Sequence, residues 1–361
     1  MNSDIILFIV VAAALVFGFT NGFHDTFDVI STAVSTGAAP PQVAIVVAAL
    51  LNFAGAFLSI AVATTVARDV VDATAITPTV VFAGLIGAIA WNLATWWLGL
   101  PSSSSHALIG GMVGATVAAV GTGAVAVGGL VDKVLLPALV APIVAFLVAG
   151  VLIAFAYKLF GGRRPGPVTR GFRVAQVASG GLLALAHGAN DAQKTMGVIT
   201  LALIANGTLG AAAGPPSWAI VAAAAAIALG TYSGGWRILR TTGARIIKMD
   251  AAQGFSAQSA GAAAILVSTY LGFPISTTHA INGGVMGAGA AKRVSAVRWG
   301  VAGNIVVAWL LTLPAAAAIG AAVYGVTRIF GTGALGPVLV TLMAISLAAS
   351  VFGRRLRPSA A

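Results

Sequence analysis

The sequence predicts an all-α polytopic membrane protein built from two related halves. Hydrophobic residues make up 59% of its 361 residues and charged residues only 7%, and the mean hydropathy is +1.02. Ordinary soluble domains do not have this composition. The apolar residues also form long uninterrupted runs, and two motifs within these runs occur twice. Together these features predict inverted-topology repeats with two broken-helix, re-entrant hairpin units.

Most of the apolar runs are long enough to cross a bilayer core of roughly 30 Å. The first run follows Met-Asn-Ser-Asp without a basic segment, so we interpret it as a span and not as a removable signal peptide. The predicted membrane segments are 5–24, 42–66, 79–100, 106–128, 134–160, 174–206, 217–236, 256–290, 299–327 and 333–352.

A basic segment rich in proline and glycine, 161–173, divides the chain into two predicted transmembrane repeats. The first repeat is 1–160, and the second is 174–361 with an extra C-terminal span. The net charge of +11 does not indicate a nucleic-acid partner, because Lys and Arg gather in short clusters between apolar runs.

The basic clusters also predict the topology. They occupy 161–173, 237–248, 292–298 and 354–357, and the positive-inside rule places them in the cytoplasm. Counting crossings between them puts the N-terminus outside the plasma membrane, the inner membrane of the cell, and the C-terminus inside. The two halves then begin on opposite sides, as in secondary transporters with inverted repeats.

The first repeated motif joins two apolar runs through proline and a hydroxyl cluster. Residues 98–115 and 271–288 are identical at ten of eighteen positions. Each copy contains a polar segment, which we call the first tip (101–106, PSSSSH) and the second tip (274–279, PISTTH). Proline ends one helix, and Ser or Thr can cap the next. Such a helix start offers N–H and O–H donors to an anion.

The second repeated motif carries ionisable residues inside apolar runs. Residues 21–28 read NGFHDTFD and residues 187–194 read HGANDAQK, and we call them the first and second polar motifs. Alignment places Asp25 on Asp191 and His24 on Asn190. Charged side chains in a span cost about 2.5 to 3.5 kcal/mol each on insertion scales and are usually functional. All four histidines of the chain lie in a tip or a polar motif.

The motifs NGFHDT, ALAHGANDAQKTMG, LGLPSSSSHALIGG and GFPISTTHAINGG resemble those of the inorganic phosphate transporter (PiT) family, in particular its bacterial low-affinity, proton-coupled branch. The resemblance runs over nearly the whole chain. It implies a secondary transporter that imports phosphate by cation symport, with protons as the expected coupling ion. It further implies inverted repeats, a homodimer, and cargo that can include magnesium or another divalent metal bound to phosphate. No cofactor is expected.

The resemblance also assigns roles to residues of this chain. The sequence departs from the family at Phe27 and Asp28, where related members have a small residue and Asn. The expected coupling-ion residues are Asp25, Asp28, Asp191 and His24, and no resident metal site is assigned. The expected substrate-binding residues are Ser103, Ser104, Ser105, Ser276, Thr277, Thr278, Asn190, Gln193 and Lys194.

The chemistry of these residues supports the same roles. A phosphate oxyanion requires N–H and O–H donors, and two opposed tips could hold it from both sides. Lys194 either neutralises the anion or pairs with Asp191, three residues earlier on the same helix. A carboxylate such as Asp25 repels phosphate, so we expect it to hold a proton or cation, which His24 could share.

Other classes of function fit the sequence less well. An intramembrane hydrolase could use the adjacent Ser105 and His106, but it needs one defined nucleophile and base, whereas here both are duplicated and Thr replaces Ser in the second tip. A passive anion channel suits buried aspartates poorly. Within transporters, the alternatives are sodium-coupled phosphate symport and a permease for sulfate or another tetrahedral oxyanion. The sequence therefore predicts a transporter and no enzyme.

Overall fold

The computed structural model describes residues 2–238, 249–331 and 333–356, with the backbone only for 2, 235–238, 348–349 and 351–356. The described chain is almost entirely helical, and its one β-type contact is an isolated bridge between Val71 and Val125. Of the predicted basic segments 237–248 and 354–357, residues 239–248 and 357 lie outside the described residues.

Thirteen α-helices and three short 3₁₀ or π segments occur in the described residues. They are α1 Asn2–Ser35, α2 Pro41–Gly55, α3 Ala61–Arg68, α4 Pro78–Leu98, α5 Ser104–Val120, a 3₁₀ turn Thr122–Ala124, α6 Val127–Gly129, a π-helical turn Leu130–Leu135, α7 Leu136–Phe160, α8 Pro165–Ala205, α9 Ser217–Ile238, α10 Ala251–Tyr270, α11 Thr277–Lys292, a 3₁₀ turn Val294–Ala296, α12 Trp299–Ile329 and α13 Leu335–Leu356.

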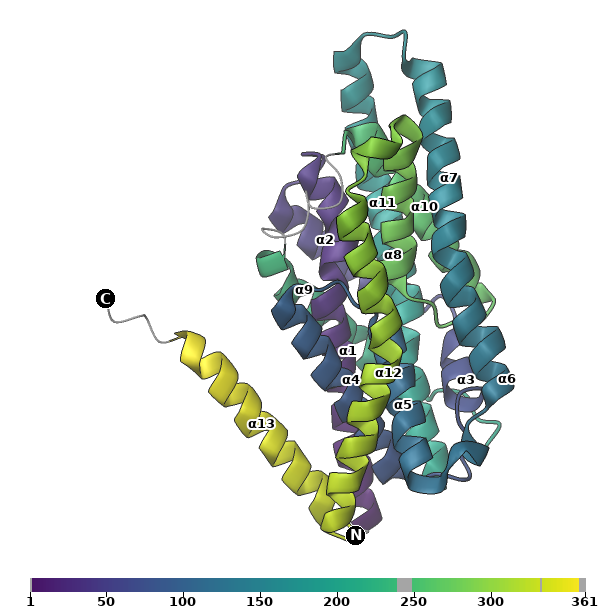
Figure 1. The fold of residues 1–361 in the computed structure, drawn as a ribbon, viewed down its shortest axis with the longest axis vertical. Coiled ribbons are helices and arrows are strands. Elements are labelled where there is room, and N and C mark those ends of the chain that lie inside the picture. The colour runs from purple at the N-terminus through teal and green to yellow at the C-terminus, as the bar shows by residue number, and fades with distance from the viewer. Residues whose placement is uncertain (1, 239–248, 332, 357–361) are drawn as a thin grey trace.

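The long helices run along one common direction, as in a membrane bundle, and α13 leans away from the others (Figure 1). Among the described residues, five helical segments are long and apolar enough to cross a membrane: Ser3–Ser35, Pro78–Leu98, Val127–Phe160, Ser217–Gly234 and Trp299–Ile329. Shorter apolar helices lie at Pro41–Gly55, Ser104–Val120 and Leu335–Leu347. The predicted class, an all-α polytopic membrane protein, is confirmed.

Helix α8 is the longest helix of the described chain and lies at its centre. Its 41 residues correspond to about 61 Å at 1.5 Å per residue. Almost every side chain from 183 to 204 is buried, including the second polar motif. The polar residues between 183 and 204 therefore face other helices and not lipid, the placement expected of functional groups in a membrane.

Two predicted boundaries are wrong, and a predicted linker has helical structure. Helix α1 continues through the first polar motif to Ser35 and does not end at residue 24. The segment 42–66 is two helices, α2 and α3, separated by a turn at 56–60. The basic linker 161–173 is helical from Pro165 onward, since proline fits the first turn of a helix, where no intrahelical N–H bond is lost.

Glycines allow α5 of the first half to pack closely against α12 of the second. A Cβ atom at Gly110 would lie 2.4 Å from the carbonyl oxygen of Leu313, and one at Gly114 would lie 2.0 Å from that of Ala317. Real Cβ atoms do not approach this closely. The helix backbones therefore touch, as small residues permit in membrane bundles.

The repeat-equivalent glycines do the same for α11 and α7. A Cβ atom at Gly283 would lie 2.4 Å from the carbonyl oxygen of Pro142, and one at Gly287 would lie 2.0 Å from that of Phe146. Each helix that follows a tip thus packs against a long helix of the other predicted half, α5 against α12 and α11 against α7. This exchange of partners brings the two tips toward one another.

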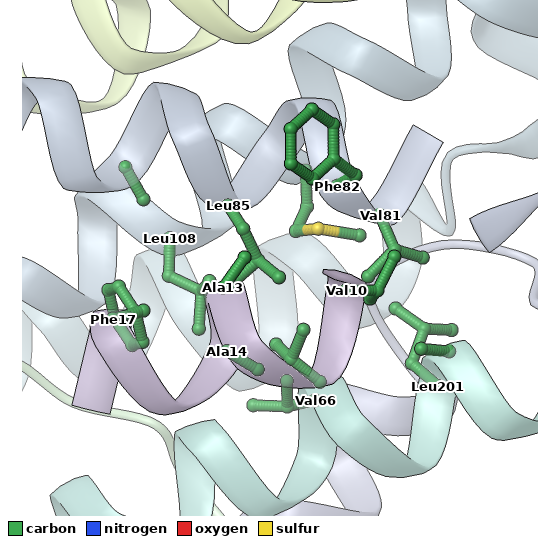
Figure 2. Packing of buried hydrophobic residues seen from close by; sticks show 14 of the residues in the cluster. Val10, Ala13, Ala14, Phe17, Val66, Val81, Phe82, Leu85, Leu108 and Leu201 are labelled. Carbon is green, nitrogen blue, oxygen red and sulfur yellow. The ribbon is translucent and has the colours of Figure 1, made fainter. Parts of the chain in front are cut away.

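The largest apolar cluster surrounds the N-terminal part of α1 (Figure 2). Its side chains come from helices of both predicted halves, so the halves share one core. Members shown in Figure 2 are Val10, Ala13, Ala14, Phe17, Val66, Val81, Phe82, Leu85, Leu108 and Leu201.

Replacing Gly287 by Ala tests the close helix contact. The added methyl group would overlap the Phe146 carbonyl, and such overpacking costs about 1 to 3 kcal/mol. Gly303→Ala is the matched control. Gly303 also lies within a helix, but it is exposed, and a Cβ atom there meets nothing within 4 Å. Thermal unfolding in detergent should show a lower midpoint for Gly287→Ala only; equal midpoints would contradict the contact.

Candidate functional site

Both tips are breaks between two helices. Helix α4 ends at Leu98 and is followed by Gly99 with φ of 68°, and α5 begins at Ser104. Helix α10 ends at Tyr270, Gly272 has φ of 76°, and α11 begins at Thr277. These left-handed glycines end the helices in the way that residues with a Cβ rarely can. The two predicted broken-helix units are therefore present.

The first hydroxyl of each predicted set caps the helix that follows. The Oγ atom of Ser103 accepts a hydrogen bond from the backbone N–H of His106 at 3.1 Å, and Ser276 accepts one from His279 at 3.3 Å. These are N-cap bonds, which stabilise a helix start by about 1 kcal/mol. The capping expected from the sequence is confirmed. The other four hydroxyls bond to groups outside their own helix start.

The two tips touch one another. The Ser105 hydroxyl donates to the carbonyl oxygen of Ile275 in the second tip at 2.8 Å, and the Lys194 ammonium donates to the same oxygen at 2.9 Å. The rings of His106 and His279 meet edge to face, with centroids 4.8 Å apart. Side chains from distant parts of the sequence thus converge on one buried place.

Two tip hydroxyls bond to the aspartates of the polar motifs in their own half. The Ser104 hydroxyl donates to Asp25 at 3.0 Å, and the Thr277 hydroxyl approaches Asp191 at 3.4 Å. All four side chains are at most 1% exposed. The repeated motifs of the sequence therefore form equivalent hydroxyl–carboxylate contacts.

A third contact of this kind crosses between the halves. The Thr278 hydroxyl donates to Asp28 on α1 at 2.7 Å. It joins the second tip to the first polar motif, and it has no counterpart in the first tip, because Ser105 bonds to a backbone carbonyl instead.

Basic side chains lie against the aspartates. Lys194 forms an ion pair with Asp191, the i,i+3 pair that the sequence offered as one alternative, and His187 lies 3.2 Å from the other oxygen of the same carboxylate. His24 is 2.6 Å from Asp25. A buried charge of either sign is costly without such a partner.

One group of side chains has the geometry of a cation site. Ligand atoms of Asp25, His187 and Asp191 all lie within 4.8 Å of one another, and all three residues are buried. Carboxylate oxygens and imidazole nitrogen can hold a proton between them or a divalent metal ion. His187 had no assigned role in the sequence analysis, although its i,i+4 spacing to Asp191 places both on one helix face.

Gln193 bonds to α3 and to its own helix. Its side-chain oxygen accepts the backbone N–H groups of Val62 at 2.8 Å and Ala63 at 3.2 Å, which belong to the first turn of α3, and its Nε2 donates to the carbonyl of Ala189. The side chain thus satisfies helix-start N–H groups that would otherwise be unpaired inside the protein. This explains why 42–66 can break at 56–60.

Asn190 forms hydrogen bonds to residues that directly precede the second tip. Its Nδ2 donates to the Thr269 hydroxyl at 2.9 Å and to the carbonyl of Phe273 at 3.1 Å. Its Oδ1 is buried without a hydrogen-bond partner. The amide therefore positions the segment between α10 and α11 and keeps one acceptor free.

Comparison with known proteins decides the family. A model of the phosphate transporter family matches residues 21–169 and 163–320. The chain belongs to the phosphate transporter family. This transporter is a multi-pass membrane protein.

Relatives named as probable low-affinity inorganic phosphate transporters align over most of the chain. The protein of Mycobacterium tuberculosis (strain ATCC 25618 / H37Rv) is 52% identical over 90% of this chain and 78% of its own length. That of Bacillus subtilis (strain 168) is 42% identical over 89% of this chain and 96% of its own. A solved structure of a protein named as the sodium-dependent phosphate transporter is 25% identical, with a TM-score of 0.82 over 90% of this transporter and 99% of that chain.

Replacing Gln193 by Leu tests the link between α8 and α3. The backbone N–H groups of Val62 and Ala63 would lose their acceptor, and a buried unpaired donor costs about 1 to 3 kcal/mol. Hydrogen exchange measured by mass spectrometry should become faster in peptides covering 58–68, with peptides of α11 unchanged. Unchanged exchange in α3 would show that Gln193 does not support this helix start.

Proposed function

We propose that this transporter imports inorganic phosphate by proton symport, with the anion bound between the first and second tips. The observation that carries the proposal is that the tips touch and that their hydroxyls end on buried carboxylates. Hydroxyl and backbone N–H donors suit a tetrahedral oxyanion. The carboxylates beside them suit the coupling ion.

Electrostatics explains why transport should be coupled. Asp25, Asp28 and Asp191 are at most 4% exposed, and among the described residues only Asp191 has a lysine partner in the site, Lys194. An anion entering this place would be repelled by ionised carboxylates at low dielectric. Protons or metal ions on the aspartates remove that repulsion, so cation and anion bind together more readily than either binds alone.

A divalent metal phosphate is a second form of cargo that the geometry favours. Asp25, His187 and Asp191 could ligate the metal while the tip hydroxyls hold the phosphate. Sodium is the alternative coupling ion, in keeping with the sodium dependence in the name of the structural neighbour. Sulfate or another tetrahedral oxyanion is the alternative substrate, because the donors of the tips do not distinguish these anions by shape.

The remaining assignments belong to the same proposal. We place the N-terminus outside the plasma membrane and the C-terminus in the cytoplasm, with inverted halves and a homodimeric assembly. Close packing of repeat-equivalent glycines supports an internal symmetry of the halves. The relatives are named as transporters, which supports transport without catalysis.

Replacing either motif aspartate tests the coupling. Asp25→Asn or Asp191→Asn should abolish proton-driven phosphate uptake in proteoliposomes, because an amide cannot carry the coupling proton. Membrane insertion should persist for both. Radiolabelled phosphate uptake under imposed proton or sodium gradients, with and without magnesium, is the measurement. Robust gradient-driven uptake by both variants would contradict the proposal and remove the aspartates from coupling.

Replacing the tip hydroxyls tests the anion site. Ser104→Ala with Ser105→Ala should weaken phosphate affinity at least about tenfold, since hydrogen bonds to charged groups contribute about 1.5 to 3 kcal/mol. Ser59→Ala is the control, because Ser59 lies in the turn before α3, where its hydroxyl oxygen accepts the backbone N–H of Ala61. Equal affinities in both variants would argue against binding at the tips.

Competition between anions tests the substrate. Phosphate changes its charge near neutral pH, whereas sulfate does not. Unlabelled phosphate should compete with radiolabelled phosphate more strongly than sulfate does, and the ratio of the two should change with pH. Equal competition by sulfate at every pH would instead favour a general oxyanion permease.

A further inference from the structure

The hydrogen bond between Thr278 and Asp28 links residues 250 positions apart and joins the second tip to α1. Asp28 is 4% exposed and Thr278 is 1% exposed. The bond is 2.7 Å long, a normal length for a hydroxyl on a carboxylate. It places an acid from the first polar motif directly on a hydroxyl that we assign to anion binding.

The contact occupies the only proton that the Thr278 side chain can donate. A threonine hydroxyl has a single O–H, and an ionised carboxylate can only accept hydrogen bonds. While Asp28 is ionised, the proton of Thr278 is therefore committed to Asp28. A phosphate oxygen, which also needs a donor, receives none from Thr278 in that arrangement.

The second oxygen of Asp28 is available for a proton. Asp28 Oδ1 is buried and has no hydrogen-bond partner, so a proton there would displace no existing bond. The titratable groups that face Asp28 are His24 and Asp25 on its own helix and His187 on α8, and Thr278 faces it from α11. Two imidazoles and a second carboxylate thus interact electrostatically with Asp28.

The repeat-equivalent position carries the opposite charge. Alignment of the two polar motifs places Asp28 on Lys194. Lys194 holds the second tip by donating to the carbonyl of Ile275, whereas Asp28 holds it by accepting from Thr278. The contact with Asp28 withdraws a donor from the tip, whereas the contact with Lys194 occupies only a backbone acceptor. Ser104 and Thr277 likewise donate to acids, Asp25 and Asp191, but only the bond of Asp28 joins the first polar motif to the second tip.

We propose that Asp28 withholds the Thr278 hydroxyl from the anion until Asp28 takes up a proton, so that proton binding precedes full anion binding. After Oδ1 takes up the proton, the carboxyl group rotates about its Cβ–Cγ bond so that the acid O–H faces Thr278 Oγ1 and donates to it, and the threonine proton turns to the phosphate. The proton on Asp28 is the coupling ion itself, and it leaves Asp28 when it is released on the other side of the membrane. Only O–H bonds form and break in this step. This inference rests on the proposed function and names the residue that sets the order of binding.

The test compares phosphate affinity of purified transporter in proteoliposomes from acidic to alkaline pH. Asp28→Asn is a neutral, nearly isosteric substitute for the protonated acid. At alkaline pH it should bind phosphate about tenfold more tightly than the unmodified chain, and at acidic pH equally well. Using the ratio of the two affinities at each pH cancels the titration of phosphate itself.

A second pair of variants shows whether the threonine proton is responsible. In a Thr278→Val background, Asp28→Asn should give clearly less tightening, because no hydroxyl is left to release and only the charge repulsion is removed. In a Thr278→Ser background, which keeps the hydroxyl, the tightening should return. Tightening of the same size in the valine background would show that Asp28 acts on phosphate only through its charge, and this would overturn the inference.

Asp72→Asn is the matched control. Asp72 also accepts a threonine hydroxyl, from Thr74 at 2.7 Å, but in an exposed loop. The hydroxyl and backbone N–H of Thr74 hold the pKa of Asp72 below its usual value, so it stays ionised throughout the test. This variant should leave phosphate affinity unchanged at every pH.

The two ways of failing are distinguishable. Phosphate binding by the unmodified chain, with no alkaline tightening in Asp28→Asn or with weaker binding, overturns the inference and leaves the proposed function standing. No phosphate binding by the unmodified chain at any pH overturns both.

Discussion

Contact between hydroxyl donors and buried carboxylates is the interaction on which the transport site depends. Three tip hydroxyls, those of Ser104, Thr277 and Thr278, end on aspartates. Inside a protein such bonds are stronger than in water, and an unsatisfied partner is correspondingly costly. A donor given to a carboxylate is unavailable to an anion. Competition for a few O–H groups is therefore the physical basis of the coupling that we propose between cation and phosphate.

The rest of the fold serves to bring these groups together. Glycines let α5 and α11 lie directly on the backbones of α12 and α7, and wider spacing would separate the tips. Asn190 fixes the segment before the second tip. Burial of the whole middle of α8 keeps its charged residues among protein partners. Close packing at small residues and the buried polar network thus both position the two tips.

Much of this arrangement could be predicted from the sequence, because duplicated proline and hydroxyl motifs mark helix breaks wherever they occur. Family, helical class and the positions of both tips followed from local pattern. The role of Gln193 could not be predicted, since its partners at Val62 and Ala63 are far away in the chain. Likewise, apolarity alone did not reveal the break at 56–60, and nothing local indicated that Thr278 would meet Asp28.

Cross-linking across the two tips tests the central claim most directly. The chain has no cysteine, so Ser105→Cys with Ile275→Cys would carry the only two thiols, at positions whose native side chain and carbonyl are in contact. A short thiol cross-linker should join them within one chain, and phosphate, but not chloride, should slow the reaction. Ser59→Cys with Ile275→Cys should not react in this way. Absence of cross-linking between positions 105 and 275, or a rate indifferent to phosphate, would contradict an anion site between the tips.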